Sequence, residues 1–210
     1  MSLLGRLAEK SWETTGPGDL DPADYRPEAA RVGLWVYFGV IVILFGLITS
    51  AYVVRMGDTF MIHGPTTDWR AMPEPPLIWV NSFILLVNSL AWEAARIAAR
   101  RANATATFAG LLGAGLIAFL FLAGQLGLWG QYAALGYFAA SNPANAFFYL
   151  ITALHGLHIL GGLFFWSRAL SRLLAGAETG AVRLSVELCA AYWHFLLLVW
   201  LIMLGLLIST

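Results

Sequence analysis

Residues 187–208 form the run ELCAAYWHFLLLVWLIMLGLLI, in which Glu187 is the only charged residue. A helix needs about 20 mostly apolar residues to cross the hydrocarbon core of a bilayer, because every backbone polar group must be satisfied inside the segment. The run meets that length, so it predicts a transmembrane helix.

Four further runs of the same kind lie upstream, at residues 33–54, 77–97, 106–128 and 147–168. The chain of 210 residues is 60% hydrophobic and only 11% charged, whereas soluble domains carry about 25% charged residues to cover a water-facing surface. The sequence therefore predicts an all-α integral membrane bundle of five transmembrane helices. Residues 31–210 would form this membrane domain and residues 1–30 a polar cytoplasmic tail, which lacks the apolar run of a cleaved signal peptide.

The basic residues predict the direction of the spans. All but two of the twelve lysines and arginines lie in or beside the tail, in the loop after the second span, or in the loop after the fourth. Because cytoplasmic loops are enriched in Lys and Arg, we expect a cytoplasmic N-terminus and a periplasmic C-terminus. Acidic residues also number twelve, so no net field indicates a nucleic-acid partner.

Small residues recur every four positions in the third predicted span, at Ala106, Gly110, Ala114 and Ala118. Such a ridge lets the backbone of another helix approach closely. It could contact another subunit or pack inside the bundle, and we favour packing inside the bundle because such ridges are common there.

Polar side chains inside the spans are the candidate functional residues, because they are costly in lipid. Three are histidines: His155 and His158, three apart and therefore on one helix face, and His194. The others are Asn81, Asn88, Glu93, Gln125, Glu187 and Tyr192. The histidines could ligate a haem, form part of a proton relay, or donate to a backbone carbonyl or to a neighbouring Tyr or Asn. We favour the third interpretation, since polar groups in lipid find partners on adjacent helices. The single cysteine, Cys189, excludes an internal disulfide and a multi-cysteine metal site.

Two segments resemble subunit III of the haem–copper respiratory oxidases. Residues 147–162, FFYLITALHGLHILGG, are similar to that family's Phe-rich run into His-Gly-Leu-His-Val. Residues 191–195, AYWHF, with Val199 and Trp200 after them, are similar to its Tyr-Trp-His-Phe-Val-Asp-Val-Val-Trp. Five spans fit the short five-helix form of the family, which lacks the first two helices of the seven-helix form.

The resemblance implies an accessory, non-catalytic subunit of a proton-pumping cytochrome c oxidase in the aerobic respiratory chain, embedded in a bacterial inner membrane. It would stabilise the catalytic subunit I by direct contact, assemble with subunit II and other subunits, hold phospholipid, and support proton uptake. Haem and copper would belong to the partner subunits, with no cofactor or metal in this chain. The matched motif positions, whose implied role is structural or in lipid binding and proton uptake, are His155, His158, Glu187, Tyr192, Trp193, His194 and Trp200.

Two positions depart from the family pattern. The family's glutamate in the middle of the first span aligns with Ile41, and its aspartate after Tyr-Trp-His-Phe aligns with Leu197. Any proton-handling role built on those carboxylates therefore cannot be carried over to this chain.

The electron donor and the type of complex have alternatives. Cytochrome c is favoured over quinol because the proline-rich loop and the segment PPLIWVNS, residues 75–82, resemble bacterial cytochrome c oxidases. The alternatives are subunit III of a quinol oxidase, a companion of a nitric oxide reductase, a histidine-ligated haem b electron-transfer protein, and a small transporter.

Overall fold

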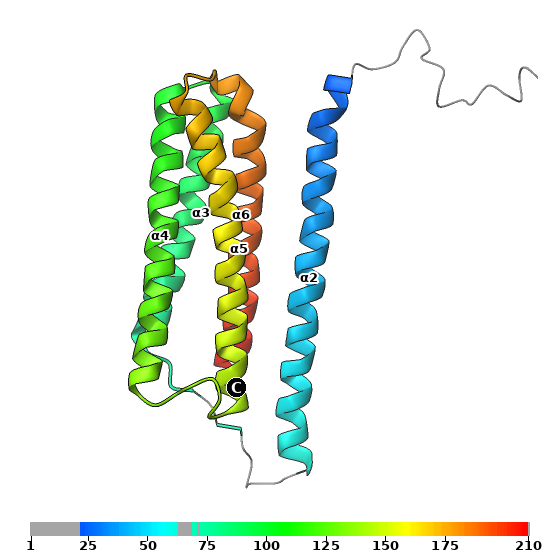
Figure 1. The fold of residues 1–210 in the computed structure, drawn as a ribbon, viewed down its shortest axis with the longest axis vertical. Helices are drawn as coiled ribbons and strands as arrows, with labels where there is room; N and C mark the ends of the chain where they lie inside the picture. The colour runs from blue at the N-terminus through cyan, green and yellow to red at the C-terminus, as the bar shows by residue number, and fades with distance from the viewer. Residues whose placement is uncertain (1–21, 63–68, 71, 210) are drawn as a thin grey trace, which may run out of the picture. The chain divides into compact units, whose positions relative to one another are not determined.

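The computed structural model describes residues 22–62, 69–70 and 72–209. Within these residues the chain forms five α-helices (Figure 1): α2 (Pro22–Ile62), α3 (Pro76–Arg100), α4 (Ala104–Ala134), α5 (Pro143–Leu174) and α6 (Thr179–Ile208). All five are long and apolar enough to cross a membrane. The prediction of an all-α protein with five long apolar helices is confirmed.

Every helix extends beyond its predicted span. The largest difference is in α2, which begins at Pro22 and continues to Ile62, while α5 continues to Leu174 and α6 begins at Thr179. The added turns of α5 and α6 carry Arg172 and Arg183. An apolar run marks only the part of a helix that hydrocarbon surrounds, whereas the backbone hydrogen bonds continue into the interfacial region, where charged side chains are tolerated.

Capping residues and glycines set the helix ends. The side-chain oxygens of Asn103 and Asn142 accept hydrogen bonds from first-turn backbone N–H groups of α4 and α5, each at 3.0 Å. After α4 and α5, Gly136 and Gly176 have φ of +84° and +83°, a left-handed conformation that glycine adopts without a steric penalty. The resulting short connections make α4, α5 and α6 run antiparallel to their predecessors in the chain.

Helices α3 to α6 run alongside one another as a four-helix bundle (Figure 1). Helix α3 contacts α4 and α6, and α5 contacts the same two helices from the other side. Large aromatic side chains fill the interior, among them Trp92, Trp193 and Trp200. The rings of Trp92 and Trp193 stack with centroids 5.7 Å apart.

The small-residue ridge of α4 packs inside this bundle. A Cβ at Gly110 would lie 2.9 Å from the Cα of Ala95 on α3, and Ala114 and Ala118 are fully buried. Only Ala106, at the first turn, is exposed. The interpretation of internal packing is therefore confirmed for three of the four positions.

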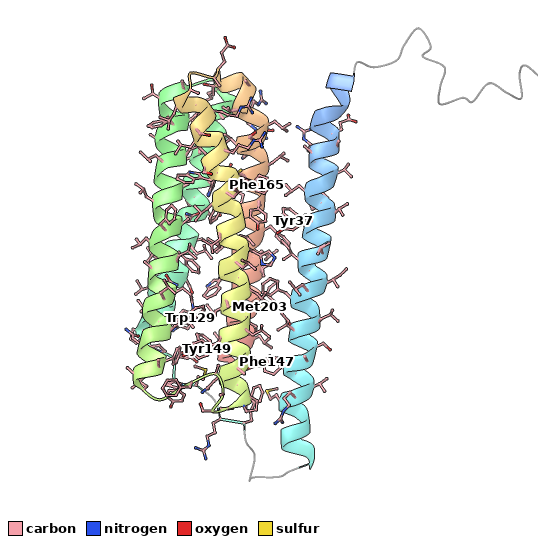
Figure 2. The ribbon with its side chains drawn as sticks, in the orientation of Figure 1. Tyr37, Trp129, Phe147, Tyr149, Phe165 and Met203 are labelled. Atoms are coloured by element: carbon pink, nitrogen blue, oxygen red, sulfur yellow. The ribbon has the colours of Figure 1, made fainter. Side chains whose placement is uncertain are left out.

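Aromatic residues also join α4 to α5 near their connecting loop. Trp129 and Tyr149 lie between these helices (Figure 2), with ring centroids 5.8 Å apart. Trp129 Nε1 donates to Thr152 Oγ1 at 3.0 Å, and Tyr149 donates from its hydroxyl to the carbonyl oxygen of Tyr137 at 3.0 Å. These contacts fix the position of α4 relative to α5 along the helix axes.

From Tyr37 onward, α2 belongs to the same compact unit as the bundle, whereas its start up to Val36 belongs to a separate unit. Its buried residues, Phe38, Ile41, Phe45 and Tyr52, recur at helical spacing. Phe38 stacks on Phe195 of α6 at 4.1 Å, and Thr49 Oγ1 lies 3.8 Å from the sulfur of Met203. The second half of α2 thus packs through one aromatic face.

Candidate functional site

A set of charged and polar residues meets where α3 packs on α6. We call this set the polar seam, and its members are Ser89, Glu93, Arg96 and Arg100 of α3, and Arg183, Glu187 and His194 of α6. Two motif positions that the sequence singled out, Glu187 and His194, belong to it.

The end of the seam nearest the basic loops is a carboxylate held by two guanidinium groups. Glu187 Oε1 accepts from Arg100 Nε at 2.9 Å and from Arg183 Nε at 3.2 Å. Both arginine side chains are about half exposed, at 50% and 51%, whereas the Glu187 side chain is 15% exposed. The arginines thus bury the carboxylate at the interfacial end while their own charges reach outward.

Deeper in the seam, His194 of α6 bridges two residues of α3. Its Nδ1 lies 2.5 Å from Ser89 Oγ and its Nε2 lies 3.3 Å from Glu93 Oε2. With the imidazole proton on Nε2, the ring donates to Glu93 and accepts from the Ser89 hydroxyl. Glu93 is also bound by Arg96, one turn further on, through both Nε and Nη2. Both imidazole nitrogens are therefore engaged.

The two pairs that cross the seam share one register. Seven residues separate Glu93 from Arg100 on α3, and the same number separates His194 from Glu187 on α6. At 1.5 Å per residue, the deeper pair lies about 10 Å further into the membrane than the outer pair. The two antiparallel helices are thus joined by side-chain contacts at two depths, and the same number of residues separates these contacts on each helix.

His155, in contrast, lies in the apolar centre of the bundle and is 1% exposed. Its ring packs edge-on against Phe121 of α4, with centroids 5.9 Å apart, and lies 5.0 Å from the ring of Trp200. Neither ring nitrogen has a hydrogen-bond partner among the described residues. Trp200 itself donates from Nε1 to Ser82 Oγ of α3 at 2.9 Å.

His158 points elsewhere, although it is three residues from His155 on the same helix. Its Nδ1 lies 2.7 Å from the carbonyl oxygen of Leu154, and its ring lies 5.6 Å from that of Phe45 on α2. Tyr192 of α6 donates from its hydroxyl to the carbonyl oxygen of His158 at 2.8 Å. The two histidines therefore contact different helices, although only three residues separate them.

The expectation that imidazoles donate to carbonyls or to a neighbouring Tyr or Asn is met by His158, which bonds to the Leu154 carbonyl. His194 bonds to Ser89 and Glu93 instead, and His155 has no hydrogen-bond partner among the described residues. Trp193, the remaining motif position, fills the interior against Trp92, and Gly162 of α5 makes room for it: a Cβ there would lie 3.2 Å from the Trp193 ring.

The arrangement does not bring two histidines to one haem iron. His155 packs on Trp200, which lies six residues beyond His194 on α6, or about 9 Å along the helix axis. His194 in turn has both nitrogens directed at α3. Among the described residues, no group of three or more His, Cys, Asp or Glu side chains is placed to hold a metal ion.

The positions at which the family resemblance leads one to expect carboxylates lie in apolar surroundings. Ile41 is 1% exposed on the packed face of α2, and Leu197 is half-buried on α6. Glu93 is the single carboxylate of α3, and it pairs with His194 and Arg96.

Reasoning from the sequence missed part of the seam. Ser89, Arg96 and Arg100 were not among the candidates, although the spacing of Glu93 and Arg96 is that of a helical ion pair. Ser82, which accepts from Trp200, was missed as well. Their roles depend on which helices are neighbours, which a single sequence does not give.

The fold and the seam define a class: a multi-pass α-helical membrane protein in which charged groups on two of the helices pair with one another. The chain matches the family model described as cytochrome c oxidase subunit III over residues 35–208. The chain therefore belongs to the cytochrome c oxidase subunit III family of the haem–copper oxidases, in its five-helix form.

Known relatives cover several types of oxidase. Cytochrome c oxidase subunit 3 of Thermostichus vulcanus is 26% identical, with 90% of each chain aligned. Quinol oxidase subunit 3 of Bacillus subtilis is 24% identical over 86% of this chain and 88% of its own length. The haem–copper oxidase subunit I+III of Aeropyrum pernix is 25% identical over 88% of this chain, which covers 23% of that longer protein. The chain is thus a respiratory, transmembrane subunit III of a haem–copper oxidase complex, in a family whose subunits III lack metal centres.

Proposed function

We propose that this chain is the accessory, non-redox subunit of a proton-pumping terminal oxidase that reduces O₂, where it stabilises the catalytic subunit I and supports proton uptake. The polar seam carries this proposal. Arginines bind both carboxylates of the seam, and both nitrogens of its one imidazole, His194, contact side chains of α3. Groups paired in this way suit a structural role more than the transfer of protons. Proton uptake would be supported indirectly, since the expected carboxylates are replaced by Ile41 and Leu197.

The seam also bears on the direction of the chain in the membrane. Its outer pair lies at the end of the bundle from which Arg101, Arg168 and Arg172 extend. Under the positive-inside rule this end faces the cytoplasm, so residues 1–30 form a cytoplasmic tail ahead of a membrane domain at 31–210. Thr210 would then face the periplasm of a bacterial inner membrane.

The motif residues have structural roles in this proposal. His158 and Tyr192 link α2, α5 and α6, while Trp193 fills the interior against Trp92 and Trp200 packs on His155. Glu187 and His194 join α6 to α3. Bound phospholipid is expected along the apolar outer faces, and contact with subunit II and the other subunits would follow from assembly on subunit I.

Cytochrome c is the proposed electron donor, supported by the proline-rich segment that leads into α3. Quinol is the second candidate, because relatives of similar identity include a quinol oxidase subunit 3. Comparing the purified complex in assays with reduced cytochrome c and with a reduced quinol separates the two. Oxidation of quinol but not of cytochrome c would contradict the first choice.

The test of the accessory role removes the subunit from the complex. An oxidase purified from a strain that lacks this chain should keep its haem absorption spectrum and some initial turnover, because no redox centre has left with the subunit. It should lose activity faster during sustained turnover than the complete complex. Restoring the chain from a plasmid is the control, and loss of the haem spectrum on deletion would contradict the proposal.

A further inference from the structure

We infer that the outer face of α3 and α6 around Glu93 and His194 is the surface by which this subunit docks on catalytic subunit I. The inference rests on the proposed function, since it names the surface that binds the proposed partner. It concerns a face of the four-helix bundle α3–α6 that carries partly exposed charged side chains.

The first observation is the exposure of ionisable groups at depth. The side chains of Glu93, Arg96 and His194 are 34%, 25% and 39% exposed. Glu93 and His194 lie about 10 Å inward of the Arg100–Glu187 pair, which marks the interfacial end of the seam. Charged groups facing hydrocarbon at that depth are costly, and in membrane proteins they face protein or a polar cavity. A protein surface is therefore expected to cover them.

The second observation is the surroundings of these groups. Large apolar side chains flank Glu93 on α3 at one and two turns' distance, and others follow His194 on α6 at the same spacing. They are exposed by 40–63%: Leu86 44%, Leu90 63%, Ile97 40%, Leu198 54% and Leu201 50%. A few polar side chains surrounded by apolar ones are typical of helix–helix interfaces in membranes, where hydrogen bonds link otherwise apolar surfaces.

The charge of these polar side chains favours a protein over a lipid headgroup. Glu93 and Arg96 cancel each other in a bidentate ion pair, so the Arg96 guanidinium is not an unpaired positive charge. A phosphate headgroup would need an excess of positive charge, and it would meet a carboxylate here. A helix with a hydrogen-bond acceptor fits better, because a guanidinium has five N–H donors and only Nε and Nη2 of Arg96 are directed at Glu93.

Subunit I is the partner that a relative of this chain indicates. In the Aeropyrum pernix relative, subunits I and III are named as one protein, so the two form parts of one molecule there. The expected contact is a largely apolar transmembrane helix of subunit I, with a carbonyl, hydroxyl or carboxylate at the level of Arg96.

Photocrosslinking in the intact oxidase tests this assignment. The photoreactive residue p-benzoylphenylalanine replaces Leu90, and in a second variant Leu86, and the complex is purified in mild detergent and irradiated. The matched control is Leu116, whose exposure of 61% is close to the 63% of Leu90 but which lies on α4, a helix that packs mainly on α3 and α5. We expect a crosslinked product of this chain with subunit I from position 90 or 86, and none from position 116.

Three results would overturn the inference while leaving the proposed function intact: a crosslink to subunit I from position 116 alone, products of positions 86 and 90 that contain only lipid, or products that contain only a second copy of this chain. In each case the chain still copurifies with subunit I. Failure to copurify at all would instead overturn the proposed function, so the two failures are distinguishable.

Discussion

Single polar side chains inside the bundle fix the rotation of the helices that carry them. Asn88 donates from Nδ2 to the carbonyl oxygen of Ala114 across the α3–α4 contact at 2.6 Å, and Trp200 donates to Ser82 across the α3–α6 contact. Such hydrogen bonds in membrane proteins contribute about 0.6 kcal/mol on average. Their directionality therefore matters more than their energy, because each bond fits only one rotation of its helix.

The bond between Trp200 and Ser82 can be measured by a double-mutant cycle of Ser82→Ala and Trp200→Phe. We expect a coupling energy of about 0.6 kcal/mol, and no more than about 1.7 kcal/mol, in the free energy of unfolding obtained by SDS titration from mild detergent. The cycle cancels the change in packing that Trp200→Phe alone causes. Ser167→Ala in place of Ser82→Ala is the control, since Ser167 is exposed and bonds within its own helix. A coupling near zero for Ser82 would show that the bond does not form.

At the scale of elements, α4 joins its two neighbours by different means. Toward α3 it presents the ridge of small residues, and toward α5 it presents a gap at Gly115 that the Trp166 indole fills. A Cβ at Gly115 would overlap this ring, whose Nε1 donates to the carbonyl oxygen of Leu111 at 2.7 Å. The close approach of α4 and α5 near this level therefore requires glycine.

Alanine substitutions two residues apart on α4 should have opposite effects. Gly115→Ala should lower the free energy of unfolding by about 1–3 kcal/mol, the usual range for overpacking a well-filled interior. Gly113→Ala is the matched control, because nothing lies within 4 Å of its added Cβ, and it should be neutral or stabilising by up to about 1 kcal/mol through helix propensity. Equal effects of the two substitutions in SDS titrations would contradict the packing of Trp166 on Gly115.

At the scale of the whole molecule, the expected direction in the membrane can be tested through the loops at the two ends of α5. The native Cys189 is buried within α6, at 7% exposure, so it gives little background with a thiol reagent. Ala140 precedes α5 and Ala175 follows it, and both are exposed. They form a matched pair of positions for labelling.

In intact cells with a permeabilised outer membrane, a membrane-impermeant maleimide should label an Ala140→Cys variant and leave Ala175→Cys unlabelled. Rupture of the inner membrane should make Ala175→Cys reactive, which serves as the control for its accessibility. The reverse pattern would place the basic loops outside and contradict the expected orientation.

The sequence predicted the number of long apolar helices because length and apolar composition suffice to define a membrane span. It did not predict how far α5 and α6 continue, because Arg172 and Arg183 interrupt the apolar pattern without interrupting the helix. The internal use of the ridge at Gly110 and Ala114 was predicted from the spacing of small residues alone.

The candidate site was predicted only in part. Glu187 and His194 of α6 and Glu93 of α3 were named as candidates, but their pairing across the two helices was not predicted, because it depends on the order of the helices around the bundle. The different surroundings of His155 and His158 could not be foreseen either. A separation of three residues leaves two side chains about 60° apart around a helix, which is enough to direct them at different neighbours.

The hydrogen bonds between α3 and α4 also have a consequence for biosynthesis. Of the five helices, α3 is the least apolar, and it carries Asn81 and Asn88, which bond to Gln125 and to the Ala114 carbonyl of α4. Only residues 101–103 separate the two helices. A nascent α3 alone in lipid would expose both amides, whereas a hairpin of α3 and α4 hides them. We therefore expect the translocation machinery to release these two helices into the bilayer together, so that membrane insertion and the first step of folding coincide.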